Sequence, residues 1–372
     1  MKLPFNDLSR SDTFSENFIE GLIELIRSGH YLSGPQTKNF EFALSDYLGV
    51  PFVKGLSSGT SALVLALKSL SLDRQSEVLM TANSGAYSRI AAEIAHLNPV
   101  YMDVDLDGLV GVKQIESAVT KSTKAIIVTH LYGQLGEMDE ISRFCKENKI
   151  YLIEDCAQAL GAKRNGMFAG SWGDVSAFSF YPTKNLGAMG DAGAIATSSR
   201  AIYENIQKLS QYGWSAKYSI EVKGGENSRI DEIQAYILSE RLPHLDVLNQ
   251  TRRLIWKRYA LAFKGGNYRL IGKSAESFVA HLAVVDAKGD RDSFRSYLDS
   301  KGIQTAIHYP IPDHFQVAFP SSGLTLPNTE YLSKSIFSLP LFPELAETEI
   351  NYVCSAITEF IRDHSNKGKS NE

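Results

Sequence analysis

Residues 124–155, KAIIVTHLYGQLGEMDEISRFCKENKIYLIED, carry the pattern that decides the fold. Two short apolar runs, at 124–133 and 150–155, lie on either side of a segment at 137–149 that is predicted to be a helix. A strand, a helix and a second strand in this order are typical of a parallel sheet covered by helices. The stretch therefore predicts an α/β protein.

The same alternation extends toward both ends of the chain. Further apolar runs of strand length lie at 77–82, 99–105, 174–180 and 193–198. Helices are expected at 15–29, where the apolar residues share one face and a final glycine suits a left-handed stop, and after the Gly/Ser turn at 55–60. This part of the chain predicts a mostly parallel sheet between helices.

The C-terminal part is organised differently. A helix from Asp231 ends before Pro243, and a longer helix then leads to the glycine pair at 265–266. Beyond it we expect a small sheet with helices, formed by 278–286, 291–302, 303–310 and a last helix from about 347 to 362. We place the change of domain along the long helix and expect a large domain over 1–250 and a small α+β domain over 251–372.

Composition and charge exclude several protein classes. The chain has 372 residues, 44% hydrophobic and 22% charged, which is close to the globular average and unlike disordered or fibrous chains. With 38 basic and 42 acidic residues and no basic run, it lacks the charge pattern that binds nucleic acid or an anionic membrane. Its three cysteines show no CxxC spacing, and no secretory signal or membrane-length apolar run is present. We expect a cytoplasmic protein without metal, nucleic-acid or membrane partners.

Lys184 is the first candidate for chemistry. It lies in FSFYPTKNLGAMGDAG, residues 178–193, and is the only charged side chain between Asp174 and Asp191. Asp155 lies where the apolar run IYLIED ends, and ligands of open α/β sheets bind at that edge. Pyridoxal phosphate chemistry requires such a pair, because apolar surroundings favour a neutral, nucleophilic amine and an acid keeps the pyridine nitrogen protonated.

Each residue also has a simpler interpretation. An Asp after a strand commonly caps the next helix, and a lysine commonly reaches water along an apolar surface. The glycines at 187, 190 and 193 favour the site, since they leave space for a ring or a second backbone. Gly59 and Thr60 in SSGTSAL supply a helix N-terminus suited to the cofactor's phosphate, although most such turns only cap helices.

The chain resembles the DegT/DnrJ/EryC1/StrS family of sugar aminotransferases, which have the fold-type I architecture of aspartate aminotransferase. The resemblance covers nearly the whole chain, through PFNDL, SGTSALVLAL, EDCAQALGA, FSFYPTKNLGAMGDAGAIAT, ENSRIDEIQAYIL, IHYPIPDHFQ and SLPLFPEL. It implies a large domain with a mostly parallel central sheet, a small C-terminal α+β domain and pyridoxal 5'-phosphate as cofactor.

The resemblance also implies roles for individual residues. Lys184 corresponds to the Schiff-base lysine and Asp155 to the carboxylate at the pyridine nitrogen. Gln158 corresponds to the residue beside the phenolic oxygen, although by itself it could be a helix-surface glutamine. The phosphate contacts are Gly59, Thr60 and Ser179, together with Asn227 from a second subunit. The active unit would therefore be a homodimer with shared active sites.

The sequence departs from the family pattern at TANSGAYSR, residues 81–89. Gly85 stands where many members have an aromatic residue that stacks on the cofactor ring. Tyr87 is the nearest replacement, and ordinary packing at a loop is the alternative. In relatives, the motif IHYPIPDHFQ lines the substrate side, which makes His308, Tyr309 and His314 candidate substrate contacts, although a lone histidine is more often structural.

The Asp155 and Lys184 pair together with the resemblance predicts amino transfer to a keto-sugar. The resemblance implies L-glutamate as the donor, a sugar activated by dTDP or UDP, and C3 as the favoured carbon. The product would be an amino sugar of a cell-surface polysaccharide or lipopolysaccharide. Amination at C4, or of an oxidised octulosonate or a cyclitol, remains open. A sugar dehydratase is disfavoured because those relatives have histidine in place of the lysine. A non-catalytic binding protein is disfavoured because the cofactor residues are intact.

Overall fold

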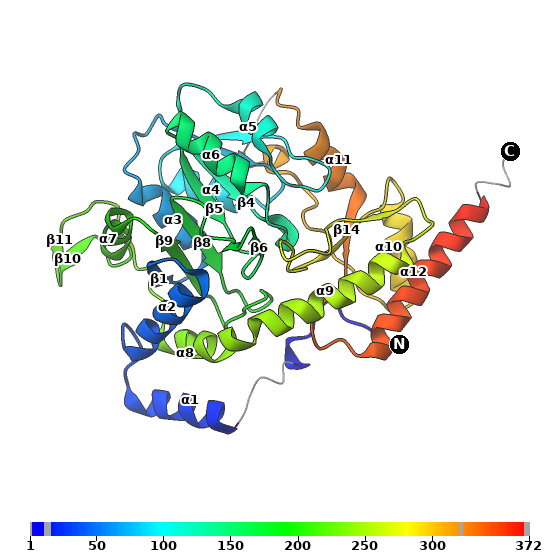
Figure 1. Cartoon of the computed structure of the whole chain (residues 1–372), viewed down its shortest axis with the longest axis horizontal. Coiled ribbons are helices and arrows are strands. Elements are labelled where there is room, and N and C mark those ends of the chain that lie inside the picture. Colours follow the sequence, from blue (N-terminus) through cyan, green and yellow to red (C-terminus); the bar gives the residue numbers. More distant parts are fainter. Residues whose placement is uncertain (1, 11–15, 320–322, 368–372) are drawn as a thin grey trace.

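The computed structural model describes residues 2–10, 16–319 and 323–367, and its centre is a seven-stranded sheet (Figure 1). In spatial order the strands are β1 (Phe52–Leu56), β9 (Gly193–Thr197), β8 (Val175–Ser179), β5 (Tyr151–Asp155), β4 (Thr123–Thr129), β2 (Glu77–Thr81) and β3 (Asn98–Met102). Neighbouring strands are parallel except around β9, which is antiparallel to both β1 and β8. The prediction of a mostly parallel sheet is confirmed.

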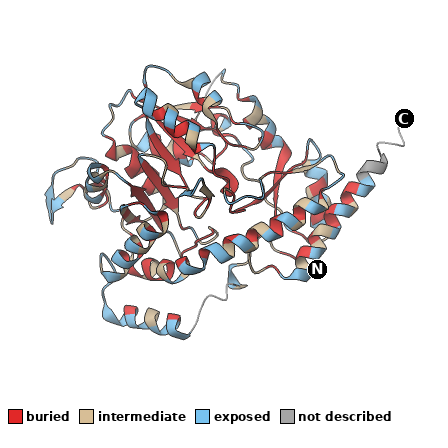
Figure 2. Ribbon diagram, viewed as in Figure 1, coloured by how far each residue is buried: buried red, intermediate tan, exposed pale blue. Residues whose placement is uncertain are grey.

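Helices cover both faces of this sheet and form a core on each. One core includes side chains of α3 (Gly59–Ser69), α4 (Tyr87–Ile94) and α7 (Arg200–Leu209). The other includes those of α2 (Pro35–Leu48), α5 (Val112–Ala118), α6 (Met138–Asn148) and α8 (Glu232–Arg241). Figure 2 shows the strands between them as almost continuously buried, as expected of a sheet covered on both faces.

The peripheral elements of this part are short or exposed. The helix α1 (Glu16–Ser28) packs through Phe18 and Leu25 and is otherwise largely exposed in Figure 2. The remaining pieces are β6 (Lys163–Arg164), β7 (Met167–Phe168), β10 (Trp214–Ala216) and β11 (Ser219–Ile220). Across the described residues, no helix has both the length and the apolar character needed to cross a membrane.

A further hydrophobic core, separate from the two on the large sheet, lies around a small antiparallel sheet at the C-terminal end of the chain. Its strands are β12 (Arg269–Leu270), β13 (Ala283–Asp286) and β14 (Ile336–Leu339). Its core includes side chains of α9 (Leu245–Ala262), α10 (Arg291–Ser300) and α12 (Glu347–Lys367). The helix α11 (Pro327–Ser335) directly precedes β14. Figure 1 shows α9 running from the large sheet to this small one, and we propose that the domain boundary lies along α9.

Two predicted strands are shorter than expected, for a reason that matters to the site. Of residues 278–286 only Ala283–Asp286 form a strand, and 303–310 take part only in isolated bridges at Ile303 and Ala306. The amides of Val279 and Leu282 donate instead to the carbonyls of Gly133 and Tyr132, at 2.9 and 3.4 Å. The segment between them is therefore tied to the turn at 131–133, which follows β4, rather than to the small sheet.

Candidate active site

A cavity of about 380 Å³ lies at the carboxyl ends of three parallel strands, β4, β5 and β8. Each of these strands ends in a polar residue that lines it: Thr129, Asp155 and Ser179. The C-terminal part of the chain closes the other side with His281, Leu282, His308 and Tyr309. The cavity thus occupies the edge where open α/β sheets bind ligands.

Asp155 is held at this edge by its strand and by two hydrogen bonds. The β4–β5 register pairs it with Thr129, whose hydroxyl donates to Oδ2 at 3.3 Å, while the amide of Ala157 donates to Oδ1 at 3.1 Å. Burial raises the pKa of the carboxyl, and the Ala157 amide and the nearby Lys184 act against that rise. The carboxyl is only 6% exposed, so a cationic group in the cavity would meet a fixed, poorly hydrated partner.

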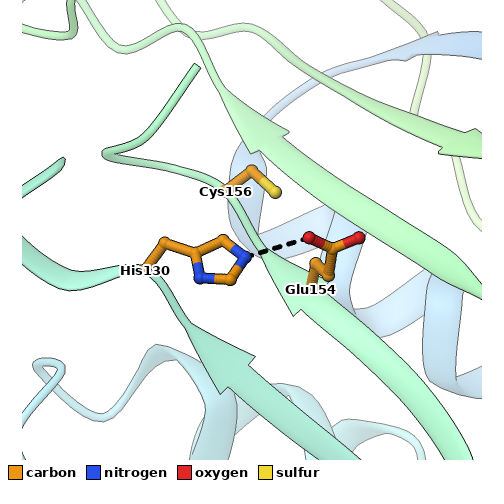
Figure 3. Close-up of side chains that lie close together, drawn as sticks. All are labelled: His130, Glu154 and Cys156. Atoms are coloured by element: carbon orange, nitrogen blue, oxygen red, sulfur yellow. Dashed lines mark hydrogen bonds and ion pairs between the residues drawn. The ribbon is translucent and has the colours of Figure 1, made fainter. Parts of the chain in front are cut away.

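The preceding residue, Glu154, points away from the cavity and braces the same strand (Figure 3). Its Oε2 accepts from the Gly170 amide at 2.9 Å and lies 3.0 Å from His130 Nε2, and its Oε1 accepts from the amides of Trp172 and Gly173, both at 2.8 Å. The backbone amide of His130 in turn donates to the Asp155 carbonyl at 3.1 Å.

Cys156 completes a buried cluster with His130 and Glu154, whose ligand-type atoms lie within 4.8 Å of one another. Such a group could hold a metal ion by its geometry alone. The Glu154 carboxylate, however, already serves four donors, and burial raises the pKa of the Cys156 thiol well above its usual value. We interpret the cluster as a brace behind Asp155.

Replacing Glu154 by alanine should therefore destabilise the fold. Three backbone amides and His130 would lose their acceptor, and unsatisfied buried donors cost at least about 3 kcal/mol together. Denaturant unfolding measures the change in the free energy of unfolding. The control, Glu147→Ala on the exposed face of α6, should change it by less than about 0.5 kcal/mol. Equal effects of the two substitutions would contradict the brace.

Lys184 enters the cavity from the loop that follows β8. Burial lowers the pKa of its amine to about 8, and Asp155 acts in the opposite direction. Among the described residues, the Lys184 amine makes no hydrogen bond or ion pair. The prediction of an amine that loses its proton easily therefore has a physical basis in burial.

The glycines after Lys184 allow close backbone approaches. A Cβ at Gly187 would lie 2.4 Å from the Pro182 carbonyl oxygen, and one at Gly193 would lie 2.3 Å from the Ser58 carbonyl carbon. Gly190 is less constrained, since its nearest neighbour is a flexible Gln234 side chain at 3.4 Å. Gly187 thus lets the loop fold back on itself at Pro182, and Gly193 lets the start of β9 approach the N-cap of α3 at Ser58.

The N-terminus of α3 forms an anion cradle on one side of the cavity. Ser58 caps the helix by accepting from the Ser61 amide at 3.1 Å, which leaves Gly59 and Thr60 at the cavity wall. A Cβ at Gly59 would lie 2.6 Å from the Cβ of Ser179, so only glycine lets the helix and β8 come this close. A free helix N-terminus beside hydroxyl groups suits a phosphate.

Gln158 is a buried residue of the cavity wall, with 7% exposure, and not a helix-surface glutamine. Its Oε1 accepts from the Tyr132 amide at 2.7 Å, and its Nε2 donates to the Tyr309 hydroxyl at 3.3 Å. These bonds link the large sheet to the motif that contains Tyr309. His308 lines the cavity beside it, and burial lowers the pKa of its ring to about 4, so the ring is neutral.

The segment that departs from the family pattern also reaches the cavity. Gly85 has a left-handed backbone with φ of 80°, and a Cβ there would lie 3.0 Å from the ring of Tyr87 and 3.1 Å from that of Tyr309. The glycine therefore makes room for two aromatic rings. Tyr87 lines the cavity and is 46% exposed, and its stacking on a cofactor ring stays a prediction.

Two predicted residues lie elsewhere. His314 is 3% exposed, with its Nε2 3.4 Å from Glu330 and its ring 4.1 Å from that of Phe315, and it is not part of the cavity wall. These contacts hold His314 outside the cavity wall, although its position in the motif had made it a candidate substrate contact. Asn227 is also outside the cavity of its own chain, where its Oδ1 accepts from Arg229 Nε at 3.0 Å. A role for Asn227 would require a second subunit.

The structure adds two residues that the sequence analysis missed. Thr129 could have been found, because it is a polar residue at the end of an apolar strand next to that of Asp155. His281 gave no such signal, since it is a single histidine within the apolar run FVAHLAVVD. Both line the cavity.

The residues present fit the pyridoxal phosphate that the resemblance implies. A helix N-terminus with hydroxyl groups would hold the phosphate, and the Asp155 carboxylate would pair with a protonated ring nitrogen. The Lys184 amine, whose pKa burial lowers to about 8, lines the same cavity. The narrow approach at Gly59 belongs to the phosphate side of this arrangement.

Comparisons with known proteins identify the family of the chain. The DegT/DnrJ/EryC1/StrS aminotransferase family matches residues 12–358. A "Pleiotropic regulatory protein" of Geobacillus stearothermophilus is 36% identical over 97% of this chain and 99% of its own. A dTDP-3-amino-3,4,6-trideoxy-alpha-D-glucose transaminase of Micromonospora megalomicea is 35% identical over 93% and 95%. A UDP-N-acetyl-3-dehydro-alpha-D-glucosamine 3-aminotransferase of Acidithiobacillus ferrooxidans is 36% identical over 92% and 93%.

Solved structures show the same likeness. DesV of S. venezuelae, in complex with a ketimine intermediate, superposes with a TM-score of 0.92 at 34% identity, covering 97% of this chain and 98% of that one. NtdA of Bacillus subtilis, with bound cofactor PMP, gives a TM-score of 0.89 at 30% identity, covering 97% and 85%. The fold-type I architecture is therefore confirmed.

Proposed function

The chain belongs to the DegT/DnrJ/EryC1/StrS aminotransferase family, and from this premise we propose that it transfers an amino group from L-glutamate to C3 of a nucleotide-linked keto-sugar. The observation that carries the proposal is the meeting of Asp155 and Lys184 in one cavity beside a helix N-terminus. The enzyme is a transaminase that uses pyridoxal 5'-phosphate, as the cofactor named for the Bacillus subtilis structure supports.

Different residues of the cavity bind the cofactor and transfer the proton. When bound, pyridoxal phosphate supplies a ring that accepts the electrons left when a C–H bond breaks. Gly59, Thr60 and Ser179 hold its phosphate, and Asp155 keeps its ring nitrogen protonated. Lys184 Nζ, with a pKa of about 8, can both take and return the proton of the substrate carbon near neutral pH.

The choice of C3 and of a nucleotide carrier rests on the relatives. The Micromonospora and Acidithiobacillus enzymes are named for amino transfer at position 3 of a dTDP-linked and a UDP-linked sugar. Amination at C4, or of a different keto-sugar, is the competing outcome. We assign the product to the amino sugars of a cell-surface polysaccharide or lipopolysaccharide, and the reaction to the cytoplasm, where the free cysteines Cys145, Cys156 and Cys354 suit a reducing environment.

We also propose that the active unit is a homodimer. Asn227 does not line the cavity of its own chain, as expected of a residue that completes the site of a second copy. Dehydratase chemistry is disfavoured by Lys184, and a purely regulatory role by the intact cavity.

A panel of keto-sugars tests this function directly. The purified enzyme is incubated with L-glutamate and 3-keto or 4-keto sugars, each with and without a dTDP or UDP carrier, and the aminated carbon is identified by NMR. We expect a 3-amino sugar to form faster than any 4-amino sugar. Preferred amination at C4, or of sugars without a nucleotide, would contradict the assignment of substrate while leaving the transaminase itself intact.

A further inference from the structure

Three buried side chains connect α9 to the cavity in a single hydrogen-bonded row. Asn249 of α9 accepts through Oδ1 from Asn185 Nδ2 at 2.7 Å, and Asn185 Oδ1 lies 2.8 Å from His281 Nδ1. The three residues are at least nine-tenths buried, with exposures of 1%, 9% and 7%. Asn185 directly follows Lys184 in the chain. The middle residue of the row is therefore the direct neighbour of the lysine in the chain.

The hydrogen bonds fix which nitrogen of His281 carries the proton. Asn185 Nδ2 donates to two acceptors, Asn249 Oδ1 at 2.7 Å and the Val279 carbonyl at 3.2 Å, and this sets the orientation of the amide. Its Oδ1 must then accept, so His281 Nδ1 is the donor. Burial, with the nearby charges of Lys184 and Arg252 and the neighbouring His308, lowers the pKa of the ring well below its usual value. His281 is therefore neutral, and Nε2 carries a lone pair.

That lone pair faces the cavity. No hydrogen bond engages Nε2 among the described residues, yet the atom is not one of those sealed without a partner in the interior. Since His281 lines the cavity, the open side of its ring is the cavity side. The left-handed backbone of Ala280, with φ of 48°, turns the chain here just before β13 begins. The cavity thus contains both an acceptor, His281 Nε2, and a possible donor, the Lys184 amine.

We propose that His281 is a positioning residue for Lys184: Asn185 holds its ring with Nδ1 protonated, and Nε2 accepts a hydrogen bond from the lysine amine when that amine is free in the cavity. This inference rests on the proposed function, in which Lys184 is the amine that moves protons. It adds an acceptor for the amine within the same cavity as Asp155, the acid whose charge also acts on Lys184.

The arrangement can be tested on the full chain without cofactor or sugar, by measuring the pH dependence of acetylation of Lys184 with acetic anhydride and peptide mass spectrometry. The parent midpoint should lie at about 8. Two variants lack the Nε2 lone pair: His281→Asn keeps a donor for Asn185, and His281→Phe keeps the ring volume. Both should lower the midpoint by about one unit, because the ammonium form loses its acceptor. His96→Asn, at an exposed histidine, is the control and should leave it unchanged.

An unchanged midpoint in both variants would overturn the proposal. So would a shift in His281→Phe alone, because that would assign His281 a structural role through Asn185. Should the variants fail to fold, nitrogen NMR of histidine-labelled parent protein decides the question: His281 must be neutral and protonated on Nδ1, and its Nε2 signal must change in Lys184→Met. A ring protonated on Nε2 would contradict the assignment. None of these outcomes depends on which sugar is aminated.

Discussion

Replacing Lys184 by alanine is expected to stop multiple-turnover amino transfer while leaving the fold intact. The amine lines the cavity from the loop after β8, and its pKa of about 8 suits proton transfer near neutral pH; positioned acid–base groups contribute factors of about 10² to 10⁴ in rate. We therefore expect kcat to fall by about 10³-fold or more. Lys184→Arg should lose as much, since its guanidinium stays protonated at every working pH.

The rate is measured as amino sugar formed per active site over many turnovers. Lys146→Ala, at an exposed lysine of α6, serves as the control and should turn over at the parent rate. Unfolding curves of the Lys184 variants should match those of the parent. If Lys184→Ala still made many equivalents of amino sugar per site, Lys184 would not be the acid–base group of this enzyme.

Replacing Asp155 by asparagine should give the second largest loss. Asparagine keeps one oxygen that can accept from the Ala157 amide, and its NH2 group can donate to the Thr129 hydroxyl, so the side chain stays anchored while the negative charge is removed. Breaking a buried ion pair costs about 3 kcal/mol or more, a factor of about 10² in kcat/KM and in cofactor affinity. The expected result is therefore weak cofactor binding together with slow turnover.

Cofactor affinity is measured by fluorescence titration and turnover by product formation, each at saturating glutamate. Asp73→Asn, at an exposed aspartate, is the control. Parental affinity and parental rate in Asp155→Asn would remove this carboxylate from the mechanism. Loss of both in Glu154→Ala, without loss of stability, would shift the role to the neighbouring acid.

The site residues that sequence could predict are those fixed by local structure. Asp155 and Ser179 end strands, Gly59 and Thr60 begin a helix, and Lys184 follows a strand within a glycine-rich loop. Because the carboxyl ends of parallel strands meet at one edge, these positions converge whatever the details of packing. The alternation around residues 124–155 was enough to predict this sheet.

The remaining features depend on contacts between distant parts of the chain. His281 reaches the cavity because the amides of residues 279 and 282 bond to the turn at 131–133 after β4, and its ring is held by Asn185, 96 residues away. A single histidine in an apolar run contains no trace of that contact. His314 shows the opposite case, since it shares a motif with His308 yet packs against Glu330 and Phe315.

The central claim is that Lys184 and Asp155 carry out glutamate-dependent amino transfer, and the glutamate half of the reaction tests it most directly. The cofactor-loaded enzyme is mixed with L-glutamate in the absence of any sugar, and the visible absorbance and the released 2-oxoglutarate are measured together. We expect the absorbance to bleach and a single equivalent of 2-oxoglutarate to appear per cavity. Unchanged absorbance with no 2-oxoglutarate would contradict the roles of Lys184 and Asp155 in amino transfer.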